Sequence, residues 1–184
     1  MSEMGGLESR GVTVFPGREY VYSLAKTFEQ QRSVNDEQKI NKGYKDLFKA
    51  IFASSPNPEV LSSKVAASVF SSDDLAKVKE TVKSLFMQCT LIEPTGFYKS
   101  RDTGKTYEHW GLEYETTTLN PRDVYVLVER FGLANGMKKT YLQISESLGV
   151  SATRSQQITF KALRKIRASE AFKKLTSDIA LYKV

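Results

Sequence analysis

The stretch TYLQISESLGVSATRSQQITFKALRKIR, residues 140–167, holds two helical apolar patterns separated by a single glycine. In the first pattern, Tyr141, Ile144 and Leu148 recur at intervals of three and four residues, the spacing of one face of an α-helix. Gly149 follows at once, and glycine is the residue that most readily adopts the backbone of a tight turn after a helix. The stretch therefore predicts a helix, a short turn and a second helix.

Side chains that can cap helices stand at the start of both predicted helices. Thr140 precedes the first helix and Ser151 precedes the second, and each hydroxyl can accept a hydrogen bond from a backbone N–H of the first turn. The second helix has its own apolar face. The residues expected to face the core are Val150 beneath the turn, then Ile158, Ala162, Leu163 and Ile166.

The polar residues of the second helix predict contacts with DNA. In a helix-turn-helix, the N-terminal residues of the second helix reach base edges in the major groove. Gln and Arg make bidentate contacts with adenine and guanine, and basic side chains lie along phosphates. A helical hairpin that is merely basic is the simpler alternative. We predict base contacts from Ala152, Thr153, Arg154, Gln156 and Gln157, and phosphate contacts from Arg122, Arg130, Ser151, Lys161, Arg164, Lys165 and Arg167.

The charge distribution favours a polyanion as the partner. The chain has 184 residues and a net charge of +6. Residues 119–184 contain 12 Lys and Arg against 5 Asp and Glu, whereas residues 1–118 contain 15 against 16. A basic module on a neutral body is typical of proteins that bind nucleic acid. Neutralising about four to six phosphates would give a log–log salt slope of roughly −4 to −5.

Several other classes of protein are disfavoured. Cys89 and His109 are the sole members of their kinds, which excludes an internal disulfide and a Cys/His zinc site. The string DTGKT at 102–106 lacks the glycine of a phosphate-binding loop, since Lys99 stands in that place. No stretch is apolar enough for a membrane span and the N-terminus is unlike a secretory signal. We expect a cytoplasmic protein that is not an enzyme and needs no cofactor.

The rest of the chain is mostly helical in pattern. Apolar residues at helical spacing begin at Tyr20, and a further helical pattern runs over residues 34–53. Asn57 is a candidate cap for another helix, and Ser72 for the helix after it. The patterns predict an all-α fold with a short hairpin near DTGKT. We divide it into a flexible tail (1–16), a helical domain (17–90), an extended linker (91–118) and a four-helix helix-turn-helix domain (119–184).

At residues 140–167 the sequence resembles region 4 of bacterial RNA polymerase sigma factors of the housekeeping class. The match runs without a gap and includes the string KALRK at 161–165. Before it, LNPRDVYVLVERFGL at 119–133 resembles the family's helix of the form Leu-Thr-Pro-Arg-Glu that ends in Arg-Phe-Gly. The resemblance implies a domain that docks on the flap of the polymerase β subunit and reads the minus-35 promoter element.

The resemblance weakens upstream but keeps the family's order. Residues 34–85 are similar to sigma region 3, and LIEPTGF at 91–97 falls where the family enters its finger. Residues 91–118 would then be the finger, which crosses the polymerase active-site channel in the family. It carries Lys99, Arg101 and Lys105 and is less acidic than usual. Region 2, which opens the minus-10 element, is not recognisable, so a second factor would have to supply that function.

Three functions remain open on this basis. The first is a sigma-like initiation factor from a phage or other mobile element that redirects a bacterial polymerase. The second is a free-standing helix-turn-helix regulator, which would bind a palindromic site as a dimer. The third is a polymerase-binding protein that inhibits initiation or acts in antitermination.

The family's recognition helix starts Arg-Glu-Arg followed by Arg-Gln, whereas this chain has Ala152, Thr153 and Arg154 followed by Gln156 and Gln157. The resemblance therefore implies a promoter element unlike the host consensus.

Overall fold

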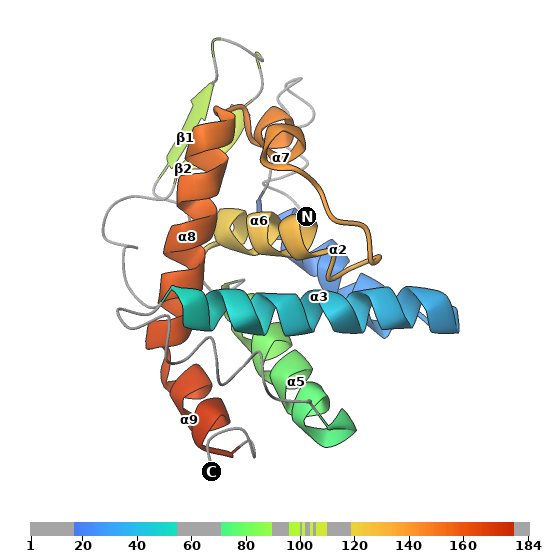
Figure 1. Cartoon of the computed structure of the whole chain (residues 1–184). Helices are drawn as coiled ribbons and strands as arrows, with labels where there is room; N and C mark the ends of the chain where they lie inside the picture. Colours follow the sequence, from blue (N-terminus) through green and yellow to red (C-terminus); the bar gives the residue numbers. More distant parts are fainter. Residues whose placement is uncertain are drawn as a thin grey trace.

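A computed structural model of the chain shows seven helices and one two-stranded hairpin among the residues it describes (Figure 1). Those residues are 17–54, 71–89, 96–99, 101, 104, 106–109 and 119–178. The helices are α2 (Arg18–Glu29), α3 (Val34–Ala53), α5 (Ser72–Gln88), α6 (Pro121–Phe131), α7 (Tyr141–Leu148), α8 (Ala152–Ala168) and α9 (Glu170–Asp178). The all-α fold class is confirmed.

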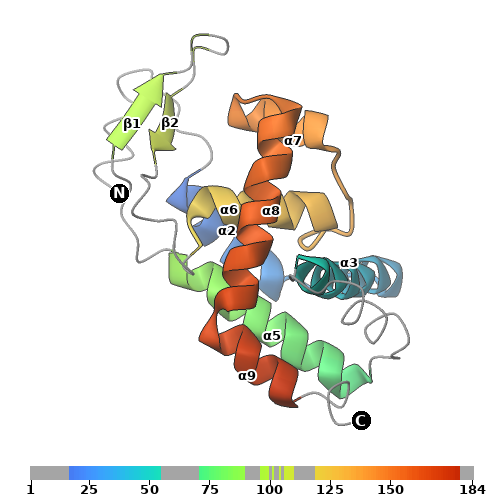
Figure 2. The ribbon, with the colours of Figure 1, turned by 60° about the vertical axis from the view of Figure 1, so that its left-hand side comes forward.

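The hairpin confirms the prediction made around DTGKT. Strand β1 (Gly96–Lys99) pairs antiparallel with β2 (Thr106–His109), with Gly96 opposite His109 and Lys99 opposite Thr106. The hairpin is small, and in Figure 2 it stands apart from α8. The core residues of the described part of the chain lie outside the two strands.

The start of α5 corrects one prediction. Ser71, not Ser72, caps this helix, because its Oγ accepts a hydrogen bond from the backbone N–H of Asp74 at 3.1 Å. A serine at either position can cap a helix, and only the backbone frame decides between them. Asp73 and Asp74 lie in the first turn as expected, where carboxylates interact favourably with the helix dipole.

The N-terminal helices and the helix-turn-helix segment share one apolar core. The rings of Tyr20 on α2 and Tyr125 on α6 meet edge to face with centroids 5.0 Å apart. Phe172 on α9 lies 5.6 Å from both Phe48 and Phe52 on α3. Aromatic pairs in this geometry contribute beyond the area that they bury. Helices of the two predicted domains therefore stabilise one another across the molecule.

Tyr20 adds a polar contact to the same junction. Its Oη donates a hydrogen bond to Glu129 Oε1 on α6 at 3.1 Å. Burial, and after it the Glu129 carboxylate, raise the pKa of Tyr20, so the phenol stays protonated and remains a donor. Glu129 also forms an ion pair with Lys139, whose Nζ lies 3.0 Å from Glu129 Oε2. This pair links the loop after α6 to the same carboxylate.

Gly43 lets α3 approach the end of α6. A Cβ at this position would lie 2.3 Å from the backbone carbonyl oxygen of Phe131. Helix propensity favours alanine over glycine by about 1 kcal/mol, but the clash forces the two helices apart. We expect Gly43→Ala to lower the free energy of unfolding by about 1–3 kcal/mol, the usual cost of overpacking. Urea denaturation measures it, and a gain in stability would contradict this contact.

Some predictions fall outside the described residues. These are the tail at 1–16, the helix capped by Asn57, most of the linker and the chain after Asp178. Among the residues that the structure does describe, no helix combines the length and apolar character required to cross a bilayer.

Candidate nucleic-acid interface

The turn between α7 and α8 has the predicted geometry. Gly149 adopts the left-handed conformation, with φ of 66°, and its N–H donates to the carbonyl of Ser145. Ser151 then caps α8, since its Oγ accepts a hydrogen bond from the N–H of Arg154 at 3.1 Å. Thr140 caps α7 in the same way, through Gln143. These contacts set where α7 begins and ends and where α8 begins, and they confirm the three predicted turn and cap residues.

The core side of both helices also agrees with the sequence. Leu148 of α7 is buried, and all four residues predicted for the inner face of α8 are buried with it. Two predicted core residues, Tyr141 and Val150, are only half-buried. Tyr141 lies beneath the guanidinium of Arg130, whose Cζ lies 4.2 Å from the ring centroid. Two small polar residues of the inner face, Ser155 and Thr159, were not predicted to be buried.

The predicted base-contacting residues lie together on the first two turns of α8. Thr153, Arg154, Gln156 and Gln157 are exposed, and Ala152 is half-buried at the first helical position. Arg154 Nη1 donates a hydrogen bond to Gln157 Oε1 at 3.4 Å. An amide oxygen has two lone pairs, so this contact leaves the Gln157 side chain able to donate and accept at a base edge.

The electrostatics at the start of α8 suit an anion. Its first turn holds no acidic residue, so the positive end of the helix dipole is not neutralised locally. Ser151 is exposed at this end, and Lys161 and Arg164 are exposed further along the same helix. This face therefore combines hydrogen-bonding groups with positive charge.

The other predicted phosphate contacts have internal partners. Lys165 Nζ lies 2.7 Å from Asp123 Oδ2, and the two side chains are 11% and 4% exposed. Arg167 Nη1 donates to Ser54 Oγ at 3.1 Å, and Arg130 Nη1 donates to the carbonyl of Lys139. Arg122 is half-buried on α6. To bind phosphate, Lys165 would have to leave Asp123.

The sequence prediction overlooked one residue of the exposed face. Phe160 lies one turn beyond Gln156 on α8 and is 46% exposed. It lines an open groove between α3 and α8 with Ala50, Ala53 and Arg164. Phe160 could have been predicted from its spacing, because a residue four positions after Gln156 lies on the same polar side of the helix.

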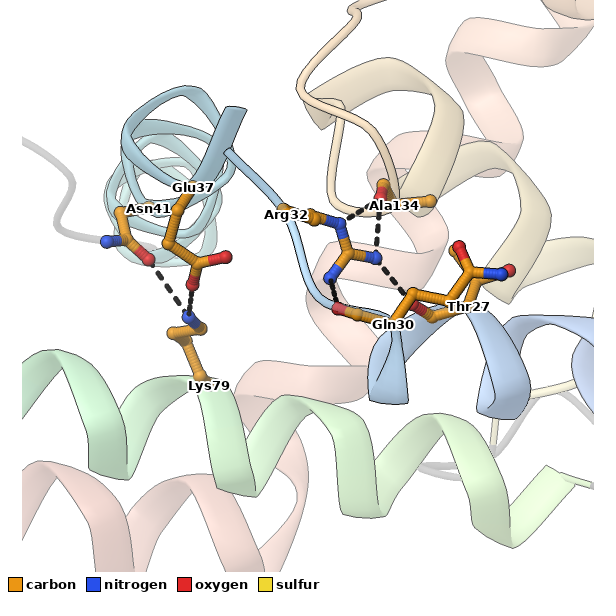
Figure 3. Close-up of polar contacts among 7 residues, drawn as sticks. All are labelled: Thr27, Gln30, Arg32, Glu37, Asn41, Lys79 and Ala134. Atoms are coloured by element: carbon orange, nitrogen blue, oxygen red, sulfur yellow. Dashed lines mark hydrogen bonds and ion pairs between the residues drawn. The ribbon is translucent and has the colours of Figure 1, made fainter. Parts of the chain in front are cut away.

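An arginine outside the helix-turn-helix holds the loop between α6 and α7. Arg32, between α2 and α3, donates to the carbonyl of Ala134 from Nε at 3.2 Å and from Nη2 at 2.9 Å. The same guanidinium donates to the carbonyls of Thr27 and Gln30, as Figure 3 shows. Arginine suits this position because its planar fork supplies several donors in fixed directions.

The helices α3 and α5 are tied in a similar manner. Lys79 Nζ of α5 contacts Glu37 Oε1 of α3 at 2.8 Å and Asn41 Oδ1 at 2.9 Å (Figure 3). The hydrogen bond from Lys79 is the main reason that the pKa of Glu37 is lowered. Arg32 and Lys79 thus join the N-terminal helices to one another and to the loop before α7.

Known proteins match the C-terminal part of the chain. A model of the family described as "Sigma-70, region 4" matches residues 117–168. The RNA polymerase sigma factor SigA1 of Synechococcus elongatus is 38% identical over 76 residues, which are 41% of this chain and 19% of the relative. Sigma factor SigA of Clostridium acetobutylicum is 43% identical over 58 residues, 32% of this chain and 15% of the relative. No solved structure matches the chain.

The matched segments cover less than a fifth of the length of these relatives. Both relatives are bacterial proteins, and they give no support to the predicted phage origin. The family match includes α6, α7 and α8 and all of the predicted base-contacting residues. Residues 117–168 of this chain therefore match the sigma-70 region 4 family and form a sigma-like DNA-binding helix-turn-helix domain.

Proposed function

We propose that the chain is a sigma-like transcription initiation factor that binds bacterial RNA polymerase core and directs it to promoters. The observation that carries the proposal is the polar N-terminal half of α8. There Arg154, Gln156 and Gln157 are exposed on a helix whose N-terminus is capped by Ser151. The relatives that match this segment are named as RNA polymerase sigma factors. In this chain, α8 would contact the bases of a minus-35-type promoter element.

The contacts with polymerase follow from the same resemblance. The helix-turn-helix domain (119–184) would dock on the β flap, and the linker at 91–118 would approach the active-site channel. We retain the predicted division into domains as part of this proposal, with the added feature that α2 packs against α6, α3 against α6 and α8, and α5 against α9.

Two measurements test the polymerase part of the proposal. The first is size-exclusion chromatography of the full chain mixed with core polymerase, with and without a competing housekeeping sigma factor. Co-elution with core is expected. The second is in vitro transcription on the source genome with core alone and then with holoenzyme. Failure to co-elute under either condition would refute the polymerase role. A dimer in sedimentation that binds palindromic DNA would instead indicate a free-standing regulator.

The substitutions at the start of α8 support a promoter element different from the housekeeping consensus. Ala152 and Thr153 stand where the family has a charged pair, and their methyl groups can contact a thymine methyl. Gln157 keeps a side chain that can bind adenine through two hydrogen bonds. The scaffold of the family is thus combined with a different set of base-contacting side chains.

We expect Gln157→Ala to weaken binding to a site selected from a random DNA pool by about 1–3 kcal/mol, with little change on unselected DNA. The reason is that the variant loses a base contact but no positive charge. Fluorescence anisotropy with both duplexes measures the difference. Glu146→Ala is a control, because Glu146 is an exposed residue of α7 outside the predicted contact set. An unchanged site preference in Gln157→Ala would contradict base reading by α8.

A further inference from the structure

We propose that Lys45 and Lys49 of α3 form a second phosphate-contacting surface, which extends the DNA interface of α8 onto the N-terminal helices. The proposal rests on the proposed function in one respect, namely that DNA lies against the exposed face of α8. The partner is the phosphate backbone of duplex DNA, and the contact is independent of base sequence.

The end of α3 adjoins the exposed face of α8. Ala50, Ala53 and Ser54 line one side of the groove whose other side includes Phe160 and Arg164. The hydrogen bond from Arg167 to Ser54 Oγ, at 3.1 Å, holds the end of α3 against the C-terminal half of α8. Figure 2 shows α3 beside the middle of α8, while the β1–β2 hairpin lies on the other side.

Lys45 and Lys49 share the face of α3 that ends at this groove. Lys45, Lys49 and Ala53 are spaced by four residues, so their side chains lie along one side of the helix. Lys49 lies about 6 Å and Lys45 about 12 Å along the axis from Ala53, at 1.5 Å per residue. The opposite side of α3 is buried, with Tyr44, Leu47, Phe48 and Ile51 all in the core. The lysines therefore face away from the core.

The charge of this row is not compensated by neighbours in the described part of the chain. Lys49 is exposed and Lys45 half-exposed, and neither forms an ion pair or hydrogen bond with another described residue. The acidic residue between them, Asp46, already pairs with Lys138 at 2.6 Å. Lysines in such a setting attract an anionic surface.

The path of DNA over α8 leads toward this row. In a helix-turn-helix, the N-terminal residues of the second helix contact base edges, and residues further along lie toward the phosphate backbone. Phe160 and Arg164 stand two to three turns along α8, at the groove that α3 shares. A backbone strand passing over Arg164 would next meet the end of α3, where Arg167 contacts Ser54, and Lys49 and Lys45 would continue the positive charge along α3.

The number of phosphates neutralised separates this arrangement from binding by α8 alone. Three cations of α8 are exposed, Arg154, Lys161 and Arg164, and neutralisation of about three phosphates by their charges would give a log–log salt slope of about −3. Adding Lys45 and Lys49 would bring the slope to about −4.5, at roughly −0.9 for each contact. Lys165 and Arg167, which the sequence prediction counted as phosphate contacts, have internal partners. With Lys45 and Lys49 in their place, the expected slope again falls in the range predicted from the sequence.

The test is the salt dependence of DNA binding by the full chain. The probe is a mixed-sequence duplex of about 30 base pairs, titrated from low to physiological salt. For the double variant Lys45→Gln/Lys49→Gln, we expect the slope to fall in magnitude by about 2 and the affinity to drop on selected and unselected duplexes alike. Circular dichroism and thermal melting confirm that the variant is folded.

Lys26→Gln/Lys77→Gln is the matched control. It removes the same charge from exposed positions on α2 and α5, and neither residue lines the groove. We expect it to keep the wild-type slope. Equal slopes for both double variants, or the absence of DNA binding by the wild type, would overturn the proposal. Loss of binding to core polymerase with the wild-type DNA slope retained would overturn it too, and would assign the row to an acidic protein surface.

The two proposals can fail separately. If Gln157→Ala leaves site preference intact while Lys45→Gln/Lys49→Gln lowers the slope, base reading by α8 fails and the lysine row stands. If Gln157→Ala alters site preference and the slope does not respond to the lysine variants, the reverse holds.

Discussion

Replacement of Leu148 by alanine should lower the free energy of unfolding by about 2–5 kcal/mol, the range observed when a buried leucine is truncated. Leu148 is 1% exposed and ends α7, directly before the turn that leads to α8. The lost methyl groups leave a cavity between α7 and α8 that the short helix cannot close without moving the turn at Gly149. Since small domains are stable by only about 5–15 kcal/mol, much of the stability would be lost.

Urea denaturation followed by circular dichroism measures the change, and DNA binding should weaken with it. Leu142→Ala is the matched control, because Leu142 lies on the same helix and is 62% exposed. Substitutions at such exposed sites usually change stability by no more than about 0.5 kcal/mol. If the two variants were equally stable, the assigned packing of α7 on α8 would be incorrect.

Replacement of Lys165 by methionine is expected to cost about 3–5 kcal/mol, because it leaves a buried carboxylate without its cation. Asp123 is 4% exposed and is held near Lys165 by its place in the first turn of α6. There its Oδ2 also accepts a hydrogen bond from the backbone N–H of Asn120 at 3.1 Å. One backbone contact does not compensate a full negative charge that has been withdrawn from water.

Two variants distinguish this effect from a general loss of charge. Lys173→Met removes a lysine from an exposed pair with Glu170, at 3.4 Å, and should change stability by less than about 1 kcal/mol. The double variant Lys165→Met/Asp123→Asn should recover most of the stability, because the unpaired charge is gone and the amide oxygen can still accept from Asn120. A cost for Lys165→Met no larger than that for Lys173→Met would show that the pair is not buried in solution.

The local features of the helix-turn-helix could be predicted from the sequence because each depends on residues a few positions apart. The caps at Thr140, Ser151 and Asn120 each involve a hydroxyl or amide and the N–H three residues later. The turn at Gly149 depends on the glycine's own backbone freedom. The buried face of α8 follows from the 3.6-residue repeat. Even the error at the start of α5 was of a single position, because the prediction named Ser72 and the cap is the adjacent Ser71.

The roles of individual basic residues required the tertiary structure. Lys161, Arg164, Lys165 and Arg167 form one basic run in the sequence, yet only the first two are exposed. Lys165 finds its partner 42 residues away in Asp123, and Arg167 finds its partner 113 residues away in Ser54. No local pattern records such contacts.

The sequence by itself thus determined the helices, the turn and the polar N-terminal half of α8, since these depend on short-range hydrogen bonds and helical periodicity. Only the tertiary structure decided that α3 lies against α6 and α8. That arrangement depends on the close approach at Gly43, where no side chain separates α3 from the carbonyl of Phe131. Packing of this kind joins residues that are distant in the chain, so it is set by the shapes of surfaces that exist only after the helices have formed.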